Sequence, residues 1–95
     1  MSWTFLSNHG HVLVYLGSSP DARLKDIAEV VGITERSAHG ILQDLIDGGY
    51  VTKLKAGRRN SYALNPNLAL RHPAEANHSI GELINVFASP NIESK

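Results

Sequence analysis

The sequence contains no cysteine, which excludes disulfides, thiolate metal sites and catalysis by a thiol. It also lacks a long apolar run: the N-terminal stretch from Val12 to Leu16 has no basic flank and is far shorter than the roughly 20 residues that cross a bilayer. Apolar residues make up 42% of the chain and charged residues 19%, which is typical of globular proteins. We therefore expect a soluble cytoplasmic protein, and 95 residues are enough for one core.

An excess of positive charge, which is common in proteins that bind nucleic acid, is missing as well. Nine Lys and Arg balance nine Asp and Glu. The charge is nevertheless segregated, because residues 53–62 hold four cations and no acid, which leaves a net charge of −4 on the remainder. Such a local basic surface can contact phosphates, so the overall balance does not exclude DNA as a partner.

Three helices are predicted in the first half of the chain by apolar spacing and capping residues. The first follows Ser7 and ends in a Gly-Ser-Ser-Pro run, the second ends at Gly32, and the third has Thr34 as its N-cap. Gly48 and Gly49 are predicted to end the third helix, since both can take positive φ. The residues expected to face the core are Leu6, Val12, Leu13 and Leu16, then Leu24, Ile27, Ala28 and Val31, then Ala38, Ile41, Leu42, Leu45 and Ile46.

A hairpin and a further helix are predicted after residue 50. Residues 51–54 and 61–64 have β propensity and flank a predicted turn at 57–60. The start of the last helix stays open, because Pro73 suits the first turn of a helix whereas Ser79 with Glu82 fits a capping box. Its expected apolar face comprises Ala76, Ile80, Leu83, Ile84 and Phe87.

The segment between the second and third helices has the spacing of a helix-turn-helix. Ala28 is small where the third helix must cross closely, and Gly32 allows a tight turn between the two helices. With the hairpin, this predicts an α+β, mainly α, winged helix-turn-helix: a three-helix core, a two- or three-stranded β-hairpin wing and a C-terminal helix. Residues 1–66 would form the DNA-binding domain, and residues 67–95 a connector and C-terminal helix for packing or dimerisation.

The outward face of the predicted recognition helix, residues 34–48, is divided along its length. Hydrogen-bond donors occupy its first half, whereas Asp44 and Asp47 in the second half would repel phosphate, so the helix should enter the major groove by its N-terminal end. Arg36 could pair with guanine and Gln43 with adenine. Gly40 either permits close approach of the DNA backbone or is tolerated without a role.

The predicted wing, residues 50–64, would place its cations along phosphates or in the minor groove. An exposed hairpin kept soluble by its charges is the alternative reading of the same pattern. The DNA-binding candidates indicated by the residues are Arg36, Ser37, His39, Gly40, Gln43, Lys53, Lys55, Arg58, Arg59 and Asn60.

The segment from Arg23 to Leu64 resembles the winged helix-turn-helix of MarR-type bacterial transcriptional regulators and their small relatives. The resemblance implies operator binding by a homodimer, with the third helix in the major groove and the wing on the flanking backbone. It adds Thr34 to the groove candidates and supports Arg58 and Arg59 as wing contacts. The chain is shorter than typical MarR regulators, which dimerise through long terminal helices.

No enzyme, cofactor or metal site is expected from the sequence. It shows no nucleophile–base motif and no phosphate-cradling glycine loop, and the five histidines are expected to be solvated, with no acidic partner for His72 or His78 at ligand spacing. The competing interpretation is a winged helix that binds a protein partner instead of DNA.

The expected partners are double-stranded DNA and a second copy of the chain. The apolar stripe of the last helix either packs on the first helix with Trp3 and Phe5 or pairs with the same helix of a second chain. We favour the homodimer, through the C-terminal helix and potentially the first helix.

Overall fold

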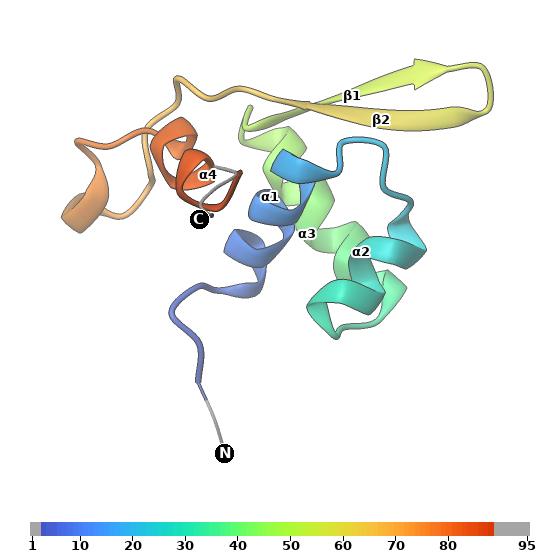
Figure 1. Cartoon of the computed structure of the whole chain (residues 1–95), viewed down its shortest axis with the longest axis horizontal. Helices are drawn as coiled ribbons and strands as arrows, with labels where there is room; N and C mark the ends of the chain where they lie inside the picture. Colours follow the sequence, from blue (N-terminus) through green and yellow to red (C-terminus); the bar gives the residue numbers. More distant parts are fainter. Residues whose placement is uncertain (1–2, 89–95) are drawn as a thin grey trace, which may run out of the picture.

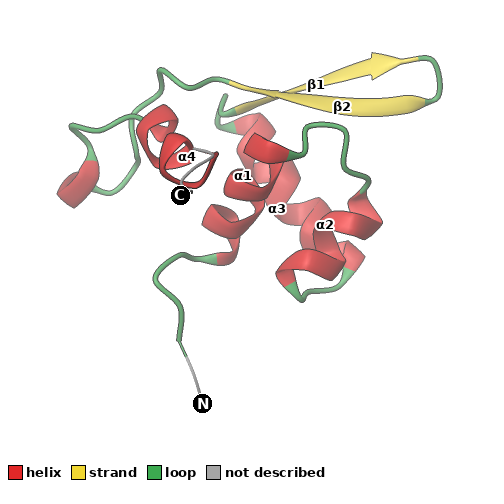
Figure 2. Cartoon of the chain, in the orientation of Figure 1, coloured by secondary structure: helices red, strands yellow, loops and turns green. Residues whose placement is uncertain are grey.

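A computed structural model describes residues 3–88. Helices α1 to α3 form a bundle from which a hairpin of β1 and β2 projects, and α4 lies at the other end of the molecule (Figures 1 and 2). Within the described residues, no helix is both long and apolar enough to traverse a lipid bilayer. The elements are α1 (Asn8–Ser18), α2 (Leu24–Val31), α3 (Glu35–Asp47), β1 (Val51–Ala56), β2 (Arg59–Leu64), the 3₁₀ turn Pro73–Glu75 and α4 (Ile80–Ala88).

The core forms where the three predicted apolar stripes meet. The helices α1, α2 and α3 all contact one another, while Val51 and Tyr62 extend the core under the base of the hairpin. Leu24, Val31 and Ile46 pack at its border and are partly buried. Besides Ala22 in the loop before α2, the fully or largely buried residues lie on the helices: Val12, Leu13, Leu16, Ile27, Ala28, Ala38, Ile41, Leu42, Leu45 and Ile80.

The helix boundaries follow the predicted capping residues. The Ser7 hydroxyl accepts a hydrogen bond from the Gly10 amide at 3.2 Å, and the Thr34 hydroxyl accepts one from the Ser37 amide at 3.0 Å. Gly32 ends α2 with a φ of 84°, a left-handed conformation that glycine adopts without strain. The prediction for the end of α3 was half right: Gly49 takes a φ of 85°, whereas Gly48 keeps a right-handed φ of −79°.

The hairpin is tighter than its sequence suggested. Its strands pair in antiparallel register from Val51 opposite Leu64 to Ala56 opposite Arg59, and the turn consists of Gly57 and Arg58 alone. The predicted four-residue turn at 57–60 is therefore wrong, because Arg59 and Asn60 belong to β2. Gly57 has a φ of 65° and Arg58 a negative φ, the sign pattern of a type II′ turn, in which glycine stands first.

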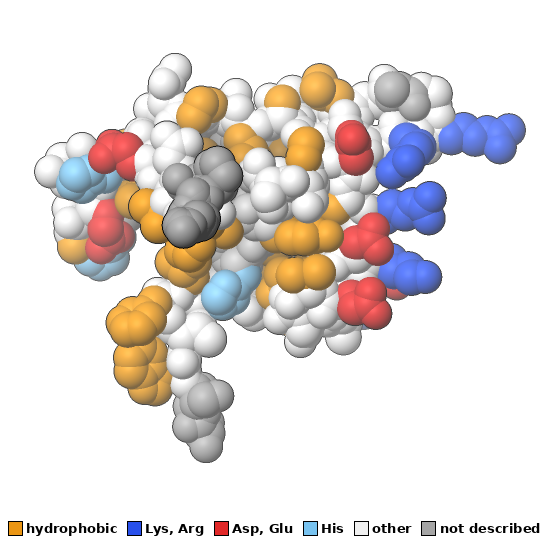
Figure 3. Space-filling model, viewed as in Figure 1, with side chains coloured by type: hydrophobic (Ala, Val, Ile, Leu, Met, Phe, Trp, Pro, Cys, Tyr) orange, Lys and Arg blue, Asp and Glu red, His pale blue; other side chains and the backbone are white. Residues whose placement is uncertain are grey.

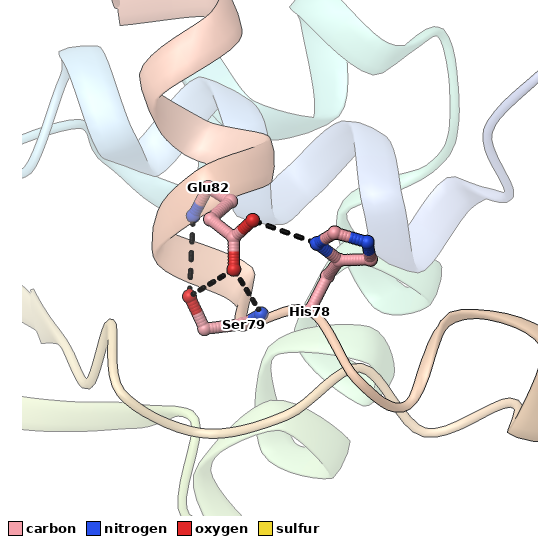
Figure 4. Close-up of polar contacts among 3 residues, drawn as sticks. All are labelled: His78, Ser79 and Glu82. Carbon is pink, nitrogen blue, oxygen red and sulfur yellow. Dashed lines mark hydrogen bonds and ion pairs between the residues drawn. The ribbon is translucent and has the colours of Figure 1, made fainter.

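The last helix begins at the later of the two predicted starts. Pro73 opens only a short 3₁₀ turn, and α4 begins after Ser79. The Ser79 amide donates to the Glu82 carboxylate at 3.0 Å, and the Glu82 amide donates back to the Ser79 hydroxyl at 3.4 Å (Figure 4). This reciprocal pair satisfies two backbone donors at the helix start, and the His78 ring nitrogen contacts the same carboxylate at 2.7 Å.

Helix α4 packs on α1 without the two aromatic residues that the sequence suggested. A methyl group at Gly17 would lie 2.7 Å from Ile84, which shows how closely the two helices approach. Trp3 and Phe5 instead stack edge-on with 5.0 Å between ring centroids and remain 72% and 92% exposed. Phe87 is 54% exposed, so the predicted apolar face of α4 is only partly covered within one chain.

The cap of α4 predicts a pH-dependent contribution to stability. The hydrogen bond from the Ser79 amide, followed by that from His78, lowers the pKa of Glu82 below its ordinary value of 4.5. Its stabilisation is therefore fully present above pH 4.5 and disappears as the pH falls through the lowered pKa. We expect Glu82→Gln to lower the melting temperature at pH 7, and we expect its difference from the wild type to shrink as the pH falls from 4.5 through the lowered pKa of Glu82. Thermal melts across this pH range would measure the effect, with Glu29→Gln at an exposed position as the control. If both variants behaved alike, the proposed role of the Glu82 carboxylate in capping α4 would be contradicted.

Candidate nucleic-acid interface

The N-terminal end of α3 is exposed, and no other part of residues 3–88 covers it. Thr34, Glu35, Arg36, Ser37 and His39 are all exposed. Among residues 3–88, the Arg36 guanidinium has no side-chain hydrogen-bond or carboxylate partner, because the bonds of this helix end involve other groups. Its donors are available to an external acceptor.

Three other candidates on α3 already have partners inside the helix. Thr34 donates from its hydroxyl to that of Ser37 at 3.0 Å while capping the helix, so both side chains have a structural role. The Gln43 amide donates to Asp47 at 3.0 Å and would have to exchange that carboxylate for a base edge. Among the predicted groove residues, Arg36 and His39 are therefore the ones whose side chains can reach outward without breaking a hydrogen bond within the described part of α3.

Gly40 has no structural reason within the described part of the chain to be glycine. A methyl group built on it meets no atom within 4 Å, and the residue is exposed in the middle of α3. Glycine costs about 1 kcal/mol relative to alanine at such a position. If Gly40 has a role, its cause lies outside the described residues, and a DNA backbone is the partner that the sequence suggested.

The hairpin distributes its polar side chains over two faces. By register, Lys53, Lys55 and Asn60 share a face with the buried Val51 and Tyr62. Burial raises the pKa of the Tyr62 phenol above its ordinary value of 10.0, an effect opposed by a hydrogen bond from Asn60. Asn60 is thus partly engaged with the base of the wing.

The tip of the hairpin places its two arginines differently. Arg58 occupies the second position of the turn and is exposed, whereas Arg59 is the first residue of β2. A terminal nitrogen of Arg59 donates to the backbone carbonyl of Asp21 at 3.2 Å, in the loop between α1 and α2. The two arginines, which the sequence presented as equivalent, therefore differ in their contacts.

The cations of the described residues gather at one end of the molecule. Of the eight Lys and Arg residues within 3–88, all but Arg71 lie at the start of α2, at the start of α3 or on the hairpin. On the face drawn in Figure 3, the visible Lys and Arg side chains lie along the edge formed by α2 and the hairpin tip, with acidic side chains beside them, and none lies over α1 or α4. Arg23 and Lys25 at the start of α2 were not predicted, although their position at the entrance to the helix-turn-helix could have indicated them.

Four of the five histidines are exposed as expected, whereas His11 is partly buried, and several are less isolated than the sequence indicated. His9 lies 2.8 Å from the Asp44 carboxylate and joins α1 to α3, and His72 lies 3.9 Å from Glu75. His78 contacts Glu82, so the expectation that His72 and His78 lack acidic partners was wrong. Within the range 3–88, no three His, Asp or Glu side chains converge as metal ligands would.

Comparison with known proteins supports this arrangement. The sequence model of the IclR helix-turn-helix domain family matches residues 6–55, more than half of the chain. Among solved structures, MepR, a transcription regulator of the Staphylococcus aureus multidrug efflux pump MepA, superposes with a TM-score of 0.54 at 24% identity, covering 62% of this chain and 46% of MepR. AdcR, a zinc-dependent MarR family transcriptional regulator in its Zn(II)-bound state, superposes with a TM-score of 0.50 at 18% identity, covering 68% and 47%.

The chain spans about half the length of these two proteins, and at such identities the likeness concerns the fold. This likeness of fold, together with the family match over residues 6–55 and the β1–β2 hairpin, confirms the winged helix-turn-helix expected between Arg23 and Leu64. No curated protein matches the chain in sequence.

Proposed function

The chain belongs to the IclR helix-turn-helix domain family, and on this premise we propose that it regulates transcription by binding double-stranded DNA in a sequence-specific manner, without enzymatic activity. The N-terminal end of α3 enters the major groove, and the hairpin lies on the adjacent backbone or in the minor groove. The observation that carries the proposal is the exposed Arg36, free of side-chain partners among residues 3–88, at the start of α3, which lies beside α2 on the side of the molecule toward which the hairpin projects (Figure 1).

The proposed contacts fall into two classes. Arg36, with His39 beside it, faces base edges, whereas Lys53, Lys55 and Arg58 contact phosphates and set the orientation. We add Arg23 and Lys25 to the phosphate contacts, because the first helix of a helix-turn-helix crosses the DNA backbone. Thr34, Ser37, Gln43, Asn60 and Arg59 remain candidates that would each retain or exchange a contact within the chain.

The experiment that tests the proposal is a titration of random and selected duplexes at several salt concentrations. Each phosphate contact should contribute about 0.9 to the slope of log affinity against log salt. Affinity should fall steeply with salt for every duplex, while duplexes selected from a random library should bind more tightly than random ones. A flat or absent response would instead support the interpretation of the fold as a protein-binding module.

We also propose a homodimer in the cytoplasm, assembled through α4 and potentially α1, with residues 1–66 as the DNA-binding domain and 67–95 as the connector and dimerisation segment. Its support is the apolar surface left on this part of the chain, where Phe5, Val86 and Phe87 are 92%, 71% and 54% exposed. A two-fold dimer would match a palindromic operator. Sedimentation at micromolar concentrations should show the dimer, and a monomer throughout would contradict it.

Gly40 gives a prediction in which stability and binding change in opposite directions. Gly40→Ala should stabilise α3 by about 1 kcal/mol, which raises the melting temperature by roughly 4–8 °C. If the DNA backbone approaches Gly40 closely, the added methyl group should weaken binding despite the greater stability. Thermal melts and anisotropy titrations would measure both, with Asn85→Ala on α4 as the control; unchanged affinity would mean that Gly40 is merely tolerated.

A further inference from the structure

We propose that Arg59 is a positioning residue, which holds the hairpin at a fixed angle to the helix-turn-helix through the backbone carbonyl of Asp21. This inference rests on the proposed DNA binding for its functional consequence, and it removes Arg59 from the group of simple phosphate contacts. The residue instead determines where the other hairpin cations lie relative to the tip of α3.

The evidence is a pair of hydrogen bonds between β2 and the loop that leads into α2. The Tyr62 amide donates to the Pro20 carbonyl at 2.9 Å, and the Arg59 guanidinium donates to the next carbonyl, that of Asp21, at 3.2 Å. The first bond lies at the base of the hairpin, beside the buried Tyr62 side chain, and the second lies at the tip end of β2. Two points of attachment define a direction, whereas the base alone would leave a hinge.

The length of the hairpin gives the second attachment its importance. Six residues per strand extend about 17–20 Å at roughly 3.3 Å per residue, so a rotation of about 10° at the base would move the tip by about 3 Å. The side chains of Lys53, Lys55 and Arg58 are exposed, and in the described part of the chain no other side-chain hydrogen bond holds the tip half of the hairpin to the helices. A shift of about 3 Å is enough to lose a phosphate contact.

The bond from Arg59 to Asp21 also connects the hairpin to the segment that leads into the helix-turn-helix. Asp21 lies two residues before Arg23, which begins the helix-turn-helix, and the Arg23 amide is itself bonded to Asp26 in the first turn of α2 at 3.2 Å. The hairpin is therefore attached to the segment that leads into α2, which packs against α3. As a result, the hairpin tip and the start of α3 keep a constant separation.

Arg59→Lys and Arg58→Lys are a matched pair of substitutions that test the proposal, since both keep the charge. Lysine is shorter than arginine by about one bond and presents no planar fork, so the substituted side chain of Arg59→Lys loses the Asp21 bond while remaining able to attract a phosphate. We expect Arg58→Lys to change affinity by less than about threefold, and Arg59→Lys to lower it about tenfold with a shallower salt slope, because neighbouring cations lose their contacts too.

A measurement without DNA separates this inference from the proposed function. Backbone order parameters of Gly57 and Arg58 from ¹⁵N relaxation should fall in Arg59→Lys and stay unchanged in Arg58→Lys. Equal affinities and equal order parameters for the two variants would overturn the proposal. If the wild type bound no duplex, the proposed function would fail. The order parameters would still test the attachment of Arg59 to Asp21: a fall in Arg59→Lys alone would support it, and equal values in both variants would overturn it.

Discussion

We expect the variant with Lys53, Lys55 and Arg58 all replaced by glutamine to bind every duplex about 500-fold more weakly than the wild type at about 0.1 M salt. A phosphate contact contributes about 0.9 to the salt slope, which corresponds to a factor of about 8 in affinity at this concentration relative to about 1 M. Three independent contacts multiply to the stated loss. The three side chains are exposed, so the fold should be unaffected.

The salt dependence of the residual binding identifies the cause. Without the three contacts, the slope of log affinity against log salt should be shallower by about 2.7. Arg71→Gln is the control for removal of one positive charge, since this cation lies over the Tyr50 ring at 6.0 Å, next to the base of the hairpin and away from its tip and from the start of α3. A triple variant with the slope of the wild type would show that the hairpin cations serve solubility alone.

The fold could be predicted from sequence where a local rule decided the structure. Ser7, Gly32 and Thr34 each act on the backbone within a few residues, and the apolar stripes of α1, α2 and α3 follow the helical period. The later start of α4 was among the predicted alternatives, and the reciprocal bonds between Ser79 and Glu82 decide it.

Two details that the sequence missed depend on contacts between distant segments. The Asp21 carbonyl distinguishes Arg59 from Arg58 across 38 residues. The contact between His9 and Asp44 joins residues 35 apart. Periodicity and local propensity carry no information about such pairs, which depend on how the helices and the hairpin are placed in space.

The residues of the candidate site also differ in whether a local rule or the packing of distant segments determines their position. Arg36 was correctly placed on an exposed helix face, because its position follows from the roughly 100° spacing of a single helix. The bond between Gln43 and Asp47 also obeys a local four-residue spacing, and it could have warned that the Gln43 amide is not free. Arg23 and Lys25 could have been proposed from their position at the entrance to the helix-turn-helix, whereas the location of α2 at the same end of the molecule as the hairpin depends on how the helices pack (Figure 1).

We expect Arg36→Ala to remove most of the preference for a selected operator over random DNA. A guanidinium that bonds both acceptors of a guanine discriminates against other bases by about 1–3 kcal/mol, or roughly 5- to 150-fold in relative affinity. Arg36 can supply this at little cost, because no bond within the described residues has to break first. Binding to random duplexes should fall by less, about the factor of 8 expected for one lost charge.

Comparison with Arg36→Lys separates charge from geometry. Lysine keeps the attraction to phosphate but lacks the planar fork that matches guanine, so this variant should retain random-duplex affinity while losing discrimination. Competition titrations of the selected operator against a set of duplexes with each base pair changed in turn would measure this directly. If Arg36 reads one base pair, the substitutions should relax preference at that pair alone; an equal loss on every duplex would assign Arg36 to the DNA backbone and leave base recognition to other residues of α3.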